Sequence, residues 1–164
     1  MVFYVILGAG IVGALIHGGL RKGSLARGKF LELLLAYLFF TWVGCNALLA
    51  FFGHIFEGPM IAEKIGWPPG SPFQLEIGFA NLSYGILGVL AFWIRGKFWL
   101  AVLVGYTVLL WGAAGVHIWD LQVHHNTSPY NAGIMLYLDL FIPLVLWVLY
   151  LVYRFRRGRG NSVT

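Results

Sequence analysis

Two short stretches of this sequence place a histidine and a carboxylate where their side chains could act together. The first reads GHIFE and contains His54 and Glu57, and the second reads VHIWD and contains His117 and Asp120. On a helix, residues three apart are neighbours on one face. We therefore expect each stretch to present an imidazole and a carboxylate side by side.

A third acidic position repeats at the same distance along the chain. The two histidines are 63 positions apart (117 − 54 = 63), and so are Glu76 in the triplet LEI and Asp139 in the triplet LDL (139 − 76 = 63). A parallel duplication of a two-helix unit would produce this offset, and such repeats occur in transport proteins. Identity at this offset is near background elsewhere in the chain, so the duplication rests on these positions alone.

Together these positions resemble the ligand set of a metal centre. Soluble di-iron carboxylate bundles hold two metals with paired Glu and His side chains from four helices, although there the acid precedes the histidine. Mixed nitrogen and oxygen donors without thiolate suit iron, manganese or zinc. The predicted ligands are His54, Glu57, Glu76, His117, Asp120 and Asp139, with His124 and Asn81 in a second tier. Their four carboxylates would balance two divalent cations, in a site that is redox-active toward a membrane-soluble substrate.

Three other functions are compatible with the same residues. His54 and His117 could be the axial ligands of one haem. A transporter or proton pathway could use Asp139, Glu57 and His117 as relay groups, since an acid inside a membrane helix is by default a functional-site hypothesis. The third alternative is a non-catalytic membrane scaffold. The sequence identifies no catalytic residue and does not decide whether the protein is an enzyme.

The elements that must position these residues are predicted to be membrane-spanning helices. The chain of 164 residues is 60% hydrophobic and 10% charged, whereas about a quarter of the residues in a soluble domain are charged. Five apolar runs are long enough to cross about 30 Å of hydrocarbon. They cover residues 2–20, 30–54, 75–94, 98–119 and 132–153. We predict an all-α bundle of five transmembrane helices in a single domain, residues 1–154, followed by a basic cytoplasmic tail, residues 155–164.

The charges predict how this bundle is oriented. Ten of the eleven basic residues lie in connections that face one side of the membrane, and only Lys64 lies on the other side. The positive-inside rule therefore places the N-terminus outside and the C-terminus inside. Five of the six acids, including Asp120 and Asp139, gather toward the outer side. A site built from them would face the periplasm or the exterior.

The connection over residues 55–74 is predicted to form a structured cap on this outer side. Pro59, Pro68, Pro69 and Pro72 exclude one long helix through it, and a short helix is expected over residues 60–66. Residues 53–88, with GWPPGSPFQ as their most distinctive part, resemble an uncharacterised family of small integral membrane proteins of prokaryotes. A weaker likeness in architecture links the chain to DoxX-like membrane proteins. These resemblances imply a helical bundle in a prokaryotic inner membrane, and they imply no activity.

The predicted partners follow from the same features. The lipid bilayer surrounds the helices, and anionic lipid could bind the basic tail that begins after residue 154. The basic residues serve topology in this interpretation, so no nucleic acid is expected. Glycine-rich helix faces and the short chain are compatible with a homodimer.

Overall fold

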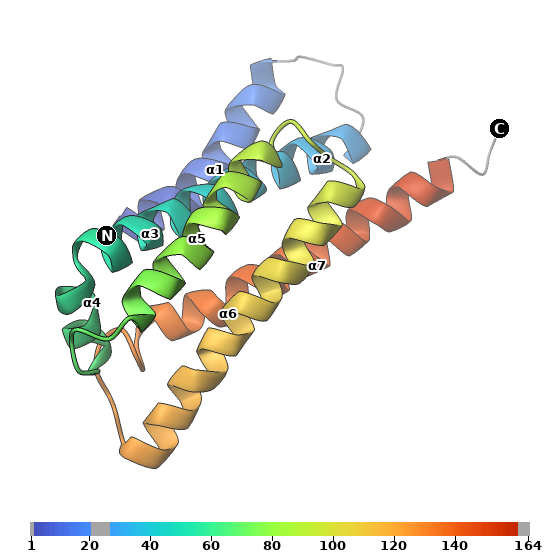
Figure 1. Cartoon of the computed structure of the whole chain (residues 1–164). Helices are drawn as coiled ribbons and strands as arrows, with labels where there is room; N and C mark the ends of the chain where they lie inside the picture. Colours follow the sequence, from blue (N-terminus) through green and yellow to red (C-terminus); the bar gives the residue numbers. More distant parts are fainter. Residues whose placement is uncertain (1, 21–26, 161–164) are drawn as a thin grey trace.

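The protein is a bundle of helices. The computed structural model describes residues 2–20 and 27–160, and within these ranges it contains no β-strand (Figure 1). In chain order the elements are α1 (Val2–Leu20), α2 (Arg27–Leu38), the π-helix η1 (Phe39–Cys45), α3 (Asn46–Phe56), α4 (Gly58–Ile65), α5 (Phe73–Leu90), α6 (Lys97–His124) and α7 (Ile134–Gly160). Arg21, Lys22 and residues 161–164 of the predicted tail lie outside the described residues.

Five helices of the described chain are long and apolar enough to cross a membrane. These candidate spans are Val2–Leu20, Lys29–Phe56, Phe73–Leu90, Lys97–His124 and Ile134–Gly158. The second span consists of α2, η1 and α3, which follow one another without a break. The prediction of an all-α, multi-pass membrane protein with five spanning helices is confirmed.

The third span ends earlier than the sequence predicted, at Leu90 rather than at residue 94. Two local features explain this end. The indole Nε1 of the fully buried Trp99 donates to the carbonyl oxygen of Ala91 at 2.7 Å, and this bond caps the end of α5. Gly96, at φ +73°, then takes a backbone conformation that other residues rarely adopt, and α6 begins at Lys97.

The last two helices are longer than predicted, and this changes which residues are helical. α6 continues past residue 119 to His124 and ends where His125 takes a left-handed conformation at φ 54°. Asp120 and His124 are therefore on one helix face, one turn apart. α7 continues to Gly160, through the boundary predicted at residue 154.

Glycines allow α5 to lie against η1 and α3. A Cβ atom at Gly88 would collide with the backbone nitrogen of Gly44, and one at Gly85 would lie 2.7 Å from Leu48 Cγ. Without a hydrophobic drive between helices in lipid, such close backbone approach supplies the packing energy. The same contact brings α5 beside His54, since a Cβ at Gly78 would lie 3.5 Å from His54 Cβ.

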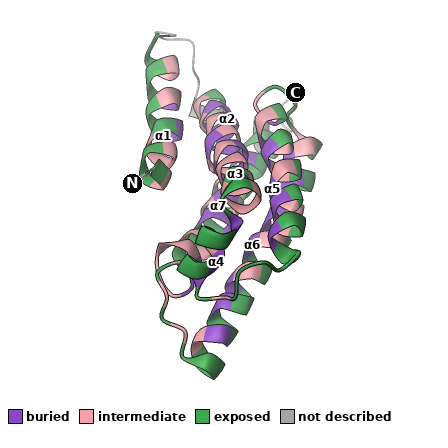
Figure 2. Ribbon diagram, turned by 60° about the vertical axis from the view of Figure 1, so that its left-hand side comes forward, coloured by how far each residue is buried: buried purple, intermediate pink, exposed green. Residues whose placement is uncertain are grey.

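α1 lies at the edge of the bundle (Figures 1 and 2). Only Gly10 and Ala14 of this helix are buried, and a Cβ at Gly10 would collide with the Thr41 hydroxyl oxygen. The indole Nε1 of Trp42 donates to the carbonyl oxygen of Leu7 at 2.9 Å. This polar contact joins α1 to η1.

The cap predicted between the second and third spans contains a short helix, α4. It begins at Gly58 with Pro59 in its first turn, where the missing proline N–H removes no helical hydrogen bond. It ends at Gly66, which has φ +86°. A Cβ at Gly66 would collide with the Ser128 hydroxyl oxygen, so this glycine lets the α6–α7 connection lie against the cap.

Candidate functional site

Asp120, near the end of α6, is the centre of a polar network at the cap end of the bundle. Its carboxylate accepts hydrogen bonds from Trp67 Nε1 at 2.9 Å, from Asn126 Nδ2 at 2.6 Å and from His124 Nδ1 at 2.8 Å. Asp120 is only 6% exposed. Hydrogen bonds to an ionised acceptor are about twice as strong as neutral ones. The carboxylate thus fastens the cap to α6 and to the α6–α7 connection.

Asn126 completes the attachment of the cap. Its Nδ2 atom donates to the carbonyl oxygen of Ile65 at 2.8 Å as well as to Asp120, and its Oδ1 atom accepts from the backbone nitrogen of Ser128 at 3.0 Å. The backbone nitrogen of Tyr130 adds a bond to the carbonyl oxygen of Lys64 at 3.0 Å. Both polar ends of the Asn126 amide are satisfied.

His117 is held in one tautomer by a buried asparagine. Its Nδ1 atom lies 2.8 Å from Asn131 Oδ1, while Asn131 Nδ2 donates to the carbonyl oxygens of Asn126 at 2.7 Å and of His117 at 3.4 Å. These two donations fix the amide orientation, so Oδ1 must accept and His117 Nδ1 carries the proton. The indole of Trp67 stacks on the imidazole, with ring centroids 5.8 Å apart and 23° between the planes. Asp120, the predicted partner of His117, is linked to it through this indole and through the two asparagines, Asn126 and Asn131.

His54 also pairs with an amide rather than with an acid. Its Nδ1 atom lies 2.6 Å from Oε1 of Gln74, which is 7% exposed. Glu57 and Glu76, the carboxylates predicted to join His54, are both exposed. The predicted pairing of His54 with Glu57 is therefore corrected. Glu57 lies at the junction of α3 and α4 with φ −123°, and there the helical spacing that would bring the two side chains together is lost.

The residues predicted to form a metal centre do not converge. In the part of the chain that the structure describes, which includes all six predicted ligands, no group of three or more His, Cys, Asp and Glu side chains could hold a metal ion. The amide side chains that bond His54 and His117 are not related by the 63-residue offset. Gln74 corresponds to Tyr137 (74 + 63 = 137), and Asn131 corresponds to Pro68 (131 − 63 = 68). The metal and haem interpretations have no support in this geometry.

Asp139 stands apart from the network at the cap. It lies in the second turn of α7, within a candidate membrane span, and is half-buried. Its carboxylate takes part in none of the hydrogen bonds or ion pairs formed among residues 2–20 and 27–160. Pro143, four residues later and inside α7, has no N–H to donate to the Asp139 carbonyl oxygen. Asp139 thus offers both a carboxylate and a backbone carbonyl without its usual helical partner.

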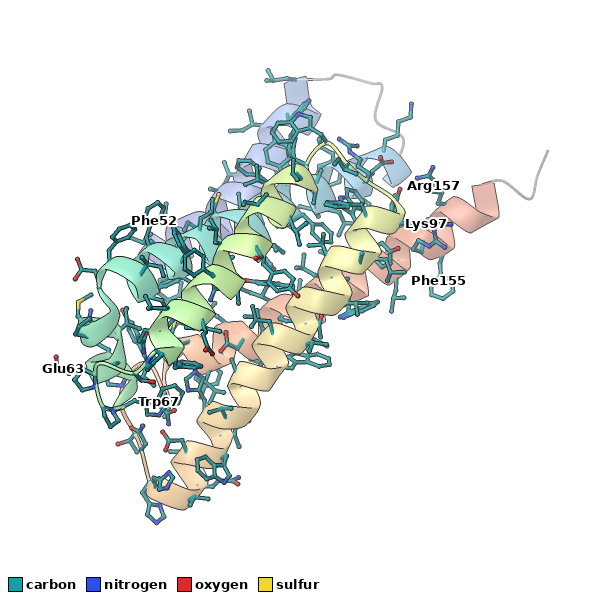
Figure 3. The ribbon with its side chains drawn as sticks, viewed as in Figure 1. Phe52, Glu63, Trp67, Lys97, Phe155 and Arg157 are labelled. Carbon is teal, nitrogen blue, oxygen red and sulfur yellow. The ribbon has the colours of Figure 1, made fainter. Side chains whose placement is uncertain are left out.

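The other predicted residues have local partners. Asn81, in the second tier, is buried and donates through Nδ2 to the carbonyl oxygen of Ile77 in its own helix at 2.9 Å. His124, also in the second tier, is exposed and is bonded to Asp120, one helical turn earlier. Trp67 lies at the cap end of the bundle, whereas Lys97 and Arg157 lie at the opposite end (Figure 3).

The chain matches a protein family over residues 1–159, almost its whole length, and that family is described as "Family of unknown function (DUF6790)". The chain belongs to the DUF6790 family. No curated protein and no solved structure is significantly similar to it. The predicted relationship to an uncharacterised membrane protein family is confirmed at this level, and the family match assigns no activity.

The sequence did not single out four of the residues that bond His54, His117 and the Asp120 carboxylate. These residues are Trp67, Gln74, Asn126 and Asn131. All lie within the region that matches the DUF6790 family. A tryptophan close to a membrane surface is expected as an interfacial aromatic residue, and the three amides carry no charge that would single them out. A neutral amide in a polar loop gives no signal until tertiary structure brings it to a histidine or a carboxylate.

Proposed function

We propose that this membrane protein binds a cation at Asp139 and passes it across the membrane. The observation that carries the proposal is a carboxylate inside a spanning helix that has no partner among the described residues. A charged side chain within the bilayer costs several kcal/mol and is usually retained where it faces an ion or proton pathway. A proton or a small metal ion would supply the compensating charge.

The helix around Asp139 supports this role. Discontinuous helices in transporters coordinate ions through carbonyl oxygens that have lost their helical hydrogen bonds. Pro143 creates such a carbonyl at Asp139 itself, one residue before the Leu140 carbonyl that accepts from Trp111 Nε1 at 3.3 Å. Asp139 therefore carries a free oxygen donor on its backbone as well as on its side chain.

The distribution of charge at the cap end favours the entry of cations. Glu57, Glu63 and Glu76 are exposed there, and Lys64 is the one basic residue of the same connection. Exposed carboxylates gathered at one end of a protein raise the local concentration of cations there. In the topology predicted from the basic residues, this end of the bundle would face the exterior of a prokaryotic inner membrane.

Flux through reconstituted protein tests the proposal. Liposomes containing purified protein would be loaded with a pH-sensitive or a cation-sensitive dye, and uptake would be followed after a gradient of protons or of alkali cations is imposed. We expect Asp139→Asn to lower the flux at least tenfold, with Asp139→Glu retaining part of it. Ser83→Ala, which changes an exposed hydroxyl on α5, is the control. Equal flux through wild-type protein and Asp139→Asn would rule out this function.

A further inference from the structure

Asn46, the first residue of α3, carries a buried oxygen atom without a hydrogen-bond partner. The residue is 6% exposed, and its Nδ2 atom donates to the carbonyl oxygen of Trp42 at 3.2 Å. Among the described residues, its Oδ1 atom is the single buried side-chain nitrogen or oxygen atom that has no hydrogen-bond partner in the protein. Since Nδ2 is bound to Trp42, the amide cannot turn to satisfy this oxygen without losing that bond.

An unsatisfied acceptor in a buried position is costly. Leaving such a group without a donor costs about 1–3 kcal/mol, and most buried polar atoms in native structures are paired. Leucine at the same position would fill similar space without this penalty. An asparagine there is therefore best explained by a ligand that contacts its oxygen.

The surroundings of Asn46 offer acceptors rather than donors. The hydroxyl of Tyr106, which is 3% exposed, donates to the same Trp42 carbonyl at 3.4 Å, so its oxygen lone pairs remain free to accept. The Thr41 hydroxyl is already used, because it donates to the carbonyl oxygen of Tyr37 at 2.9 Å. A ligand at Asn46 Oδ1 must therefore be a cation or a hydrogen-bond donor.

The backbone beside Asn46 is also unusual. Residues Phe39–Cys45 form a π-helix, η1, directly before it. π-helical turns are rare and occur frequently at functional sites. Here the Trp42 carbonyl, inside η1, accepts from two side chains, those of Asn46 and Tyr106. The Asn46 amide and the Tyr106 hydroxyl therefore meet at one backbone carbonyl.

We infer that Asn46 Oδ1 and the Tyr106 hydroxyl oxygen form a binding position for a monovalent alkali cation. Hard oxygen donors suit such ions rather than softer transition metals. Both donors are neutral, which suits an ion with one positive charge better than an ion with two. The part that this position would play in cation passage rests on the proposed function, whereas binding itself does not.

Thermal unfolding of purified protein in detergent tests the inference. The unfolding temperature would be measured in NaCl, in KCl and in choline chloride at equal ionic strength. Wild-type protein should unfold at a higher temperature in an alkali salt than in choline, by several degrees. Asn46→Leu should lose most of this shift and should be at least as stable as wild type in choline, because an unpaired oxygen has been removed.

Two further variants make the result interpretable. Thr41→Val removes a buried side-chain bond to the carbonyl four residues earlier, as Asn46→Leu does, and should keep the full alkali shift. Asn46→Asp adds a negative charge and should reach the shift at a tenfold lower salt concentration, which provides a test if Asn46→Leu does not fold. The inference would be overturned if the alkali shift persisted in Asn46→Leu. It would also be overturned if wild-type protein unfolded at the same temperature in choline chloride as in the alkali salts. If flux still depended on Asp139 in that case, the proposed function would stand without this binding position.

Discussion

Trp67 and Asp120 are 53 positions apart in the chain and are joined by a 2.9 Å hydrogen bond from the indole Nε1 to the carboxylate Oδ2. Trp67 follows the short cap helix α4, and Asp120 lies near the end of α6. The same indole stacks on His117 one turn earlier in α6. One side chain therefore fastens the connection between the second and third spans to the fourth span.

Trp67→Phe should weaken this attachment. Phenylalanine keeps an aromatic ring over His117 but cannot donate to Asp120, whose buried carboxylate then loses one of its three donors. The expected cost is about 1–3 kcal/mol in the free energy of unfolding, measured by thermal or denaturant unfolding in detergent. Trp93→Phe is the matched control, because Trp93 is 66% exposed. Similar losses in the two variants would contradict a stabilising role for the Trp67 hydrogen bond.

Gly88→Ala should destabilise the protein, whereas Gly112→Ala should not. A Cβ at Gly88 would meet the backbone of Gly44, whereas one at Gly112 would have no neighbouring atom within 4 Å. Overpacking at the first position should destabilise the protein by about 1–3 kcal/mol. Alanine is favoured over glycine in a helix by up to about 1 kcal/mol, so Gly112→Ala should be neutral or stabilising. The measurement is the unfolding temperature, and a stable Gly88→Ala protein would disprove the tight contact between α5 and η1.

The orientation of the bundle can be tested by cysteine labelling in intact cells. In a Cys45→Ser background, Ser71→Cys in the exposed cap connection should react with a membrane-impermeant maleimide added outside. Arg156→Cys, exposed near the end of α7, should react only after the membrane is permeabilised. The reverse pattern would show that the positive-inside rule gives the wrong orientation for this chain.

The spanning helices could be predicted because hydropathy alone determines which segments can enter a bilayer. α1 has the bounds that the sequence indicated. The cap helix expected over residues 60–66 covers Gly58–Ile65, with Pro59 in its first turn and Gly66 directly after its end. Helix ends set by tertiary contacts could not be predicted. The end of α5 depends on Trp99, which comes from the next helix to bond Ala91. The π-helix has no sequence pattern that separates it from an α-helix.

The candidate site was predicted only in part, for a physical reason. Asp120 and His124 are bonded because helical spacing is a local property, and α6 keeps that spacing to its last turn. The partners of both histidines are amides whose positions depend on how the loops pack. Asp139 was identified from its depth in a helix, but the freedom of its carboxylate from other side chains is visible only in three dimensions.

The most direct test of the central claim is an infrared difference spectrum of the protein on addition of cation. Spectra of wild type and of Asp139→Asn would be recorded in detergent or lipid at constant pH, with choline replaced by sodium or potassium and, separately, with the proton concentration changed. We predict a carboxyl or carboxylate band that responds to one of these cations in wild type and is absent from the Asp139→Asn spectrum. Identical difference spectra for the two proteins would show that Asp139 binds no cation, and would contradict the proposed function.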